Sequence, residues 1–161
     1  AGPYILQAVT KISSEDNSET LSNRLSEIGS KQILEALVLF ENGEVKFKDQ
    51  NEKNATYAKK ISKKEAEINW NDSAQKIIAK INGLYPYPCV WFQHKGSRIK
   101  IVKAEICNNK GNVGEVLSDE LIVGCKDKAI KINFLQKEGK KILDRKSFLA
   151  GYKILKGEVL I

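Results

Sequence analysis

Two closely spaced prolines divide this chain into parts that must fold differently. In the segment Leu84–Pro88, Pro86 and Pro88 hold the backbone extended, and helix signals are missing from the roughly fifty residues that follow. β-rich stretches separated by turn residues are predicted there, at 89–94, 98–107, 114–117, 120–125 and 129–135. A final short helix is predicted at 146–152. Several short strands in a row are typical of a small barrel or sandwich.

The part before the prolines shows helical patterns instead. Apolar residues recur at spacings of three and four in 18–28 and in 33–40, so two helices are predicted, with Gly29 as the interruption. The β-rich stretch Tyr4–Ile12 is predicted to be a strand, and Ser73–Ile81 a short amphipathic helix. The chain is therefore expected to belong to the α+β class.

The net charge of +7 is unevenly distributed along the chain. Residues 1–56 hold 6 basic and 9 acidic residues, a net charge of −3, and residues 57–161 hold the remaining 21 basic and 11 acidic residues, a net charge of +10. An excess of this kind in one part suggests a polyanionic partner. A lysine-rich surface that serves only solubility is the alternative, and charge alone does not decide between the two.

Basic residues in a linker and on one strand are the candidates for contacts to a polyanion. They are Lys59, Lys60, Lys63, Lys64, Arg98, Lys100 and Lys103. Arg98 and Lys100 share one face of the predicted strand, whereas Lys103 breaks that alternation, so a β-bulge is predicted near Ile101 and Val102. No row of exposed aromatic residues is evident, which favours contacts to the phosphates of a folded RNA over the reading of a single strand.

The sequence lacks the motifs of common catalytic centres. No nucleophile elbow, P-loop or GxGxxG motif is present, and no catalytic residue is assigned. His94, the single histidine, is predicted to be a solvated turn residue. The widely spaced Cys89, Cys107 and Cys125 are predicted to be buried or half-buried reduced thiols rather than metal ligands. No apolar stretch is long enough to span a membrane, and the absence of methionine suggests a fragment or a processed chain.

Several segments resemble methionyl-tRNA formyltransferases. Residues 56–70, TYAKKISKKEAEINW, are similar to the linker of that family, although Asn69 stands where aspartate is usual. Residues 81–88, INGLYPYP, are similar to the start of the family's C-terminal domain, and residues 98–104 resemble one of its barrel strands. Residues 1–16 resemble the end of its catalytic domain. The resemblance thus covers nearly the whole chain.

The resemblance implies a fold, an activity and a partner. Residues 1–53 would be the C-terminal remnant of a Rossmann-like formyltransferase domain, 54–82 a basic linker with a short helix, and 83–161 an OB-like five-stranded β-barrel. The family transfers a formyl group from 10-formyltetrahydrofolate to the amino group of methionyl initiator tRNA, a cytoplasmic step of translation initiation. The basic residues named above would bind that tRNA, and no metal, membrane or stable protein partner is implied.

The family's catalytic asparagine, histidine and aspartate match no position of this chain. The chain alone is therefore expected to be inactive, and the folate site to lie mostly outside it. One alternative is a related formyltransferase that acts on a nucleotide sugar or on folate, which would leave the +10 region unexplained. The other is a stand-alone OB-type RNA-binding module, which would leave the helical pattern at 18–42 unexplained.

Overall fold

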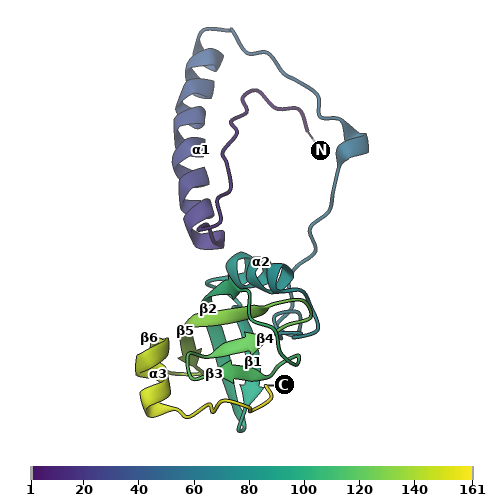
Figure 1. Cartoon of the computed structure of the whole chain (residues 1–161). Helices are drawn as coiled ribbons and strands as arrows, with labels where there is room; N and C mark the ends of the chain where they lie inside the picture. Colours follow the sequence, from purple (N-terminus) through teal and green to yellow (C-terminus); the bar gives the residue numbers. More distant parts are fainter. Residues whose placement is uncertain (1, 161) are drawn as a thin grey trace. The chain divides into compact units, whose positions relative to one another are not determined.

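The chain forms two compact units. The computed structural model describes residues 2–160, so Ala1, at the start of the N-terminal resemblance, and Ile161 lie outside the described residues. The units are Ala1–Lys60, which holds one long helix, and Ile61–Ile161, which holds the β-sheet (Figure 1). Their boundary falls inside the predicted linker, and the division of the chain at residues 53 and 82 stays a prediction.

The first unit is built on one helix where the sequence predicts two. α1 (Ser18–Glu41) runs through Gly29 without a break. It begins at a capping box, in which the Asn17 side chain accepts a hydrogen bond from the Thr20 backbone N–H and the Thr20 hydroxyl accepts one from Asn17 N–H. The predicted interruption is wrong because an internal glycine costs a helix only about 1 kcal/mol relative to alanine.

Replacement of Gly29 by alanine is expected to stabilise α1 by about 0.5–1 kcal/mol, because alanine loses less backbone entropy in a helix. A Cβ atom at this position would meet no heavy atom within 4 Å, so no steric cost opposes the gain. Thermal unfolding of the chain followed by far-UV circular dichroism should show helix content persisting to higher temperature. A lower helix content in the variant would contradict the continuous helix.

The predicted strand Tyr4–Ile12 does not form. Within residues 2–160, Tyr4 alone of this stretch pairs, in an antiparallel bridge with Lys48 whose two N–O distances are 2.9 and 2.8 Å. Strand geometry depends on a ladder of hydrogen bonds to a neighbour, and β-rich composition cannot supply one. The unit ends with the short 3₁₀ turn η1 (Glu52–Asn54).

The second unit is an antiparallel sheet flanked by two short helices. Its strands are β1 (Val90–His94), β2 (Ser97–Cys107), β3 (Val116–Ser118), β4 (Ile122–Gly124), β5 (Ala129–Lys137) and β6 (Ile142–Asp144). The order is β1-β2-β5-β4-β3, with β6 paired to β5. β6 was not predicted. Because the recorded pairings among the described residues follow an open path, the sheet is established but the predicted closed barrel is not.

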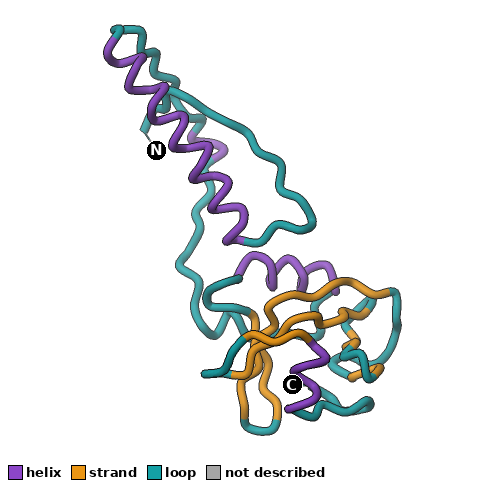
Figure 2. Tube along the Cα trace, turned by 90° about the vertical axis from the view of Figure 1, so that its left-hand side faces the viewer, coloured by secondary structure: helices purple, strands orange, loops and turns teal. Residues whose placement is uncertain are grey.

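Two helices complete this unit. α2 (Ala74–Leu84) lies along the sheet, and α3 (Arg145–Gly151) follows β6 (Figure 2). Both were predicted within a few residues. α2 is held at its start by the side chains of Ser73 and Asp127, which accept hydrogen bonds from backbone N–H groups of its first turn.

The predicted bulge in β2 is confirmed, and β5 carries a matching one. Register shifts occur between Ile101 and Lys103 and between Lys103 and Ala104 of β2. The buried residues of β2 accordingly change spacing from two to three, and β5 does the same between Ile132 and Leu135. The two irregularities compensate, so both strands keep their apolar side chains on the core side.

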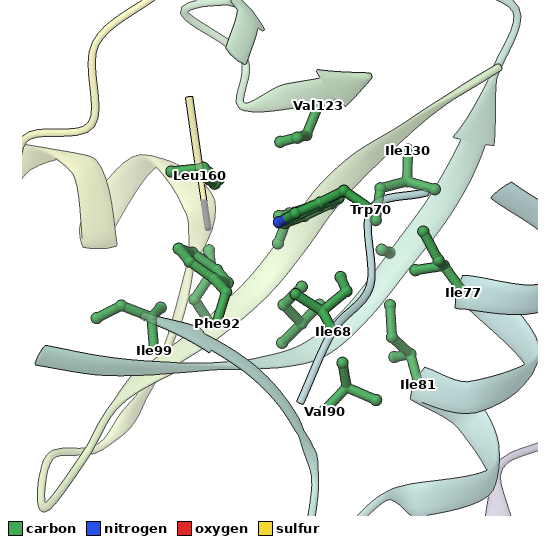
Figure 3. Packing of buried hydrophobic residues seen from close by; sticks show 14 of the residues in the cluster. Ile68, Trp70, Ile77, Ile81, Val90, Phe92, Ile99, Val123, Ile130 and Leu160 are labelled. Atoms are coloured by element: carbon green, nitrogen blue, oxygen red, sulfur yellow. The ribbon is translucent and has the colours of Figure 1, made fainter. Parts of the chain in front are cut away.

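The core lies between α2 and the sheet. Trp70 and Phe92 meet edge to face at its centre, with ring centroids 6.0 Å apart (Figure 3). Ile77 and Ile81 of α2 close one side, as predicted for that helix face. The segment that contains Trp70 belongs to the predicted linker, so part of the linker is in fact a component of this core.

Candidate nucleic-acid interface

The face of the sheet turned away from the core carries a cationic and aromatic surface. Trp91 of β1 and Lys100 of β2 are direct cross-strand partners on this outer face, since their neighbours Phe92 and Ile99 point into the core. The Arg98 guanidinium lies over the Trp91 ring, 4.2 Å from its centroid. Stacking of this kind holds a guanidinium in a fixed plane while its N–H groups stay available at the edge.

Lys63 and Lys64 lie in a turn that contacts Trp91. The Trp91 indole N–H donates to the Lys63 carbonyl, with an N–O distance of 3.2 Å. Ser62 and Glu65 cap the turn reciprocally, since the backbone N–H of each donates to the side chain of the other. The side chains of Lys63 and Lys64 are exposed there, and the Lys63 backbone contacts Trp91 directly.

The next segment is bonded directly to the edge of β1. Ile68 N–H donates to the Trp91 carbonyl at 2.9 Å, and Trp91 N–H donates to the Ala66 carbonyl at 3.0 Å. Trp91 therefore joins the turn and the sheet through both its side chain and its backbone, and the predicted linker is ordered from this point on.

The bulge turns a further pair of residues outward. Lys103 is exposed and lies opposite Phe134 of β5, which is 41% exposed. We define the outer face of the sheet by the side chains that lie on it or border it. They are Lys63, Lys64, Trp91, Arg98, Lys100, Lys103 and Phe134.

The structure brings together five of the seven basic residues singled out from the sequence. These are Lys63, Lys64, Arg98, Lys100 and Lys103, all in the second unit. Lys59 and Lys60 are exposed but belong to the end of the first unit, so they are not placed on this face. The sequence analysis missed Trp91 and Phe134. Trp91 could have been found from its alternation with buried Val90 and Phe92, whereas Phe134 follows the unpredicted irregularity of β5.

Two other cations of the unit share one carboxylate. Lys131 donates to Glu120, and Arg145 lies 3.8 Å from the same carboxylate. The hydrogen bond from Lys131 lowers the pKa of Glu120, which therefore stays charged at neutral pH. On the outer face, Arg98 has one acidic neighbour at a longer distance, Glu138 at 3.6 Å.

His94 is buried, and its prediction as a solvated turn residue is wrong. It is 8% exposed, and its ring nitrogens lie 3.1 Å from the Tyr152 hydroxyl and 2.8 Å from Glu158 Oε2. The turn next to it is solvated, but the ring points back toward residues late in the chain. The histidine is therefore part of the packing of this unit and not of the outer face.

The cysteines are free thiols, as predicted. Cys89 and Cys125 are buried and Cys107 is half-buried, and burial raises the pKa of the Cys125 thiol to about 11. Across residues 2–160 there is no group of three or more histidine, cysteine, aspartate or glutamate side chains that could hold a metal ion. The helices in the same range include none long and apolar enough to cross a bilayer.

Residues 60–153 match the family described as formyl transferase, C-terminal domain. The chain belongs to this family. The resemblance to methionyl-tRNA formyltransferases predicted from the linker and proline motifs is thereby confirmed. All residues of the outer face lie within the part of the chain that matches this C-terminal domain.

Curated relatives support the same assignment. The methionyl-tRNA formyltransferase of Pelagibacter ubique is 46% identical over 148 residues, covering 91% of this chain and 48% of the relative. That of Thermodesulfovibrio yellowstonii is 39% identical over 158 residues, covering 97% of this chain and 51% of the relative. The chain spans about half the length of the relatives it matches.

Solved structures of lower identity share the fold. A variant of HypX from Aquifex aeolicus has a TM-score of 0.67 at 21% identity, over 88% of this chain and 27% of HypX. HypX in complex with tetrahydrofolic acid has a TM-score of 0.59 at 22% identity, over 80% of this chain and 26% of HypX. At these identities the likeness extends to the fold alone.

Proposed function

We propose that this chain is the tRNA-binding part of an enzyme that transfers a formyl group from 10-formyltetrahydrofolate to the amino group of methionyl initiator tRNA. The observation that carries the proposal is the outer face, where five basic residues gather around Trp91 and Phe134 in a domain of the formyltransferase family. A methionyl-tRNA is the polyanion that the relatives' names imply. The proposal places the protein in the cytoplasm, at translation initiation.

The task of such a surface is positioning. Lysines and arginine contact phosphates without reading bases, so they fix the orientation of a folded RNA. Binding energy gained away from the reacting atoms can then hold the aminoacyl end at the site of transfer. Arg98 is suited to this because its stacking on Trp91 reduces the side-chain entropy that binding would cost.

The formyl donor is not assigned to residues of this chain. A pterin ring requires several convergent hydrogen-bonding groups. Among the described residues, two buried side-chain nitrogen atoms have no hydrogen-bond partner: Trp70 Nε1, within the apolar core, and Arg98 Nε. These two atoms do not form a set that fits the donor. The proposed contribution of this chain is therefore limited to the tRNA.

The proposal also gives the sheet a role. An OB-like barrel carries its nucleic-acid surface on the strands, and the outer face of β1, β2 and β5 corresponds to such a surface. Here the open end between β1 and β3 would be closed by other segments of the chain.

The linker lysines, which are not placed on the outer face, test whether the linker also contacts the tRNA. Replacing Lys59 and Lys60 together by alanine is expected to weaken binding of initiator tRNA. The slope of log affinity against log salt concentration should flatten by about one to two units, because fewer counterions are released on binding when phosphate contacts are lost. Fluorescence anisotropy at several salt concentrations measures both quantities. Both lysines are exposed, so the fold should not change.

The matched control replaces Lys126 and Lys128, which are also exposed and carry the same total charge. This control should keep the slope of the unaltered chain. If the two double variants lose affinity and slope equally, net charge rather than a defined site governs binding. If the Lys59 and Lys60 variant binds like the unaltered chain, these two lysines are not part of the interface.

A further inference from the structure

The irregularity of β5 turns an aromatic ring outward. Ile132 and Leu135 are both fully buried, so two residues instead of one lie between consecutive core positions of this strand. Phe134 is one of the two, and its side chain is 41% exposed on the outer face. The ring is therefore accessible to a molecule that approaches the sheet from this side.

An exposed isoleucine lies beside this ring. Phe134 pairs with Asp144, and Gln136 pairs with Ile142, in a ladder between β5 and β6 that has no register shift. Since alternate residues of a strand share a face, Phe134 and Ile142 are diagonal neighbours on the outer face, within reach of each other for an aromatic side chain. Ile142 is 44% exposed. We call the apolar patch formed by Phe134 and Ile142 the platform.

Cations border the platform on the side of β2. Lys103 lies opposite Phe134. One row of direct cross-strand partners also runs through β1, β2, β5 and β6, and it consists of Trp91, Lys100, Gln136 and Ile142. The platform is therefore continuous with the cationic part of the outer face.

The polar side chains next to the platform are engaged within the fold. The Gln136 amide donates to the Lys140 carbonyl at 2.7 Å. The Asp144 carboxylate accepts hydrogen bonds from the Ser147 hydroxyl at 2.6 Å and from Ser147 N–H at 3.1 Å, and these bonds hold the pKa of Asp144 below its usual value. Asp144 is thus charged at neutral pH, but it is directed to the first turn of α3. An apolar surface with lysines on one side remains.

We propose that the platform binds one unpaired nucleobase of the RNA, which stacks on the Phe134 ring while phosphates of the same strand contact Lys100 and Lys103. A nucleobase presents a flat apolar face with a charged phosphate close by, and this chemistry matches an aromatic ring bordered by lysines. A base inside a helix is already stacked on both sides, so the platform distinguishes unpaired from paired nucleotides. A single ring suits one such nucleotide in an otherwise folded RNA that is held by its phosphates.

The inference rests on the proposed function in one respect, namely that the ligand is an RNA. It adds a contact that does not depend on charge, and its test separates the two. Two RNA hairpins with the same stem and loop serve as probes, one with a blunt end and one with a short unpaired 3′ extension. The blunt hairpin reports contacts to phosphates, and the difference between the two hairpins reports the unpaired nucleotides.

Fluorescence anisotropy with the 161-residue chain measures both affinities. The extension should tighten binding by about fivefold or more, because stacking of one base on an aromatic side chain contributes at least this much. Phe134→Leu should abolish this gain and leave binding of the blunt hairpin unchanged, since it keeps an apolar side chain and removes the ring. Phe134→Trp should keep the gain. The matched control is Tyr87→Leu, which removes an aromatic ring that is 73% exposed and lies outside the outer face, and it should leave the gain unchanged.

The outcomes separate this inference from the proposed function. Equal affinity for both hairpins, or a gain that persists in Phe134→Leu with the fold intact by circular dichroism, would overturn the platform. If initiator tRNA is still bound in that case, the proposed function stands. A gain that depends on Phe134 without any binding of initiator tRNA would support the platform and contradict the proposed function. A dimer in gel filtration that Phe134→Leu dissociates would assign the platform to a second copy of the chain and overturn the inference.

Discussion

Replacement of Phe92 by alanine is expected to lower the free energy of unfolding of the second unit by about 3–5 kcal/mol. The Phe92 side chain is fully buried and packs edge to face on Trp70, so truncation removes apolar contacts and leaves a cavity that neighbouring strands cannot readily fill. Small domains are stable by only about 5–15 kcal/mol, so the loss is a large fraction of the total. Urea denaturation followed by tryptophan fluorescence measures it, since both tryptophans belong to this unit.

The control is Phe134→Ala in the same unit. Phe134 is 41% exposed, and its truncation should cost about 1 kcal/mol or less. Equal losses for the two variants would mean that the core of the unit does not depend on the Phe92 and Trp70 pair as described.

Joint replacement of Arg98, Lys100 and Lys103 by glutamine should have the largest effect on tRNA binding. Three contacts to phosphates would be lost, which should weaken binding roughly a hundredfold to a thousandfold at low salt and flatten the salt dependence by about two to three units. Electrophoretic mobility shifts with initiator tRNA at a series of salt concentrations would report both effects. The Trp91 ring stays in place as a support for the surface.

A matched triple variant at Lys110, Lys126 and Lys128 removes the same charge from exposed loop positions. It should bind tRNA with nearly the unaltered affinity and slope. A similar loss in both triple variants would show that attraction is spread over the whole unit. Normal binding by the variant of Arg98, Lys100 and Lys103 would remove the outer face from the proposal.

The elements of the second unit could largely be predicted from sequence. The bulge in β2 was predictable because Arg98 and Lys100 alternate with isoleucines and Lys103 breaks the alternation. β6 was not predictable in the same way, since its three residues are all exposed and show no alternation. It exists because residues 134–136 of β5 pair with it, and such pairing is not encoded within three residues.

Other predictions failed because they too depended on contacts between residues far apart in the sequence. The ring partners of His94 lie 58 and 64 residues further along the chain, so its burial could not follow from the glycine turn beside it. Tyr4–Ile12 has the composition of a strand but no neighbour to complete a ladder within the described residues. For the candidate site, charge distribution identified the basic residues, whereas the stack of Arg98 on Trp91 required the register of β1 and β2.

Sheet edges are where folded chains are most prone to aggregate, because unpaired N–H and C=O groups can recruit a strand from another molecule. Both ends of this sheet are covered by the chain itself, β1 by residues 66–68 and β3 by residues 157–160. Both covers are anchored in the core, the first through Ile68 and Trp70 and the second through Leu160. Because each cover occupies the backbone groups of an edge strand and is itself tied into the core, these two segments protect the sheet against intermolecular strand addition.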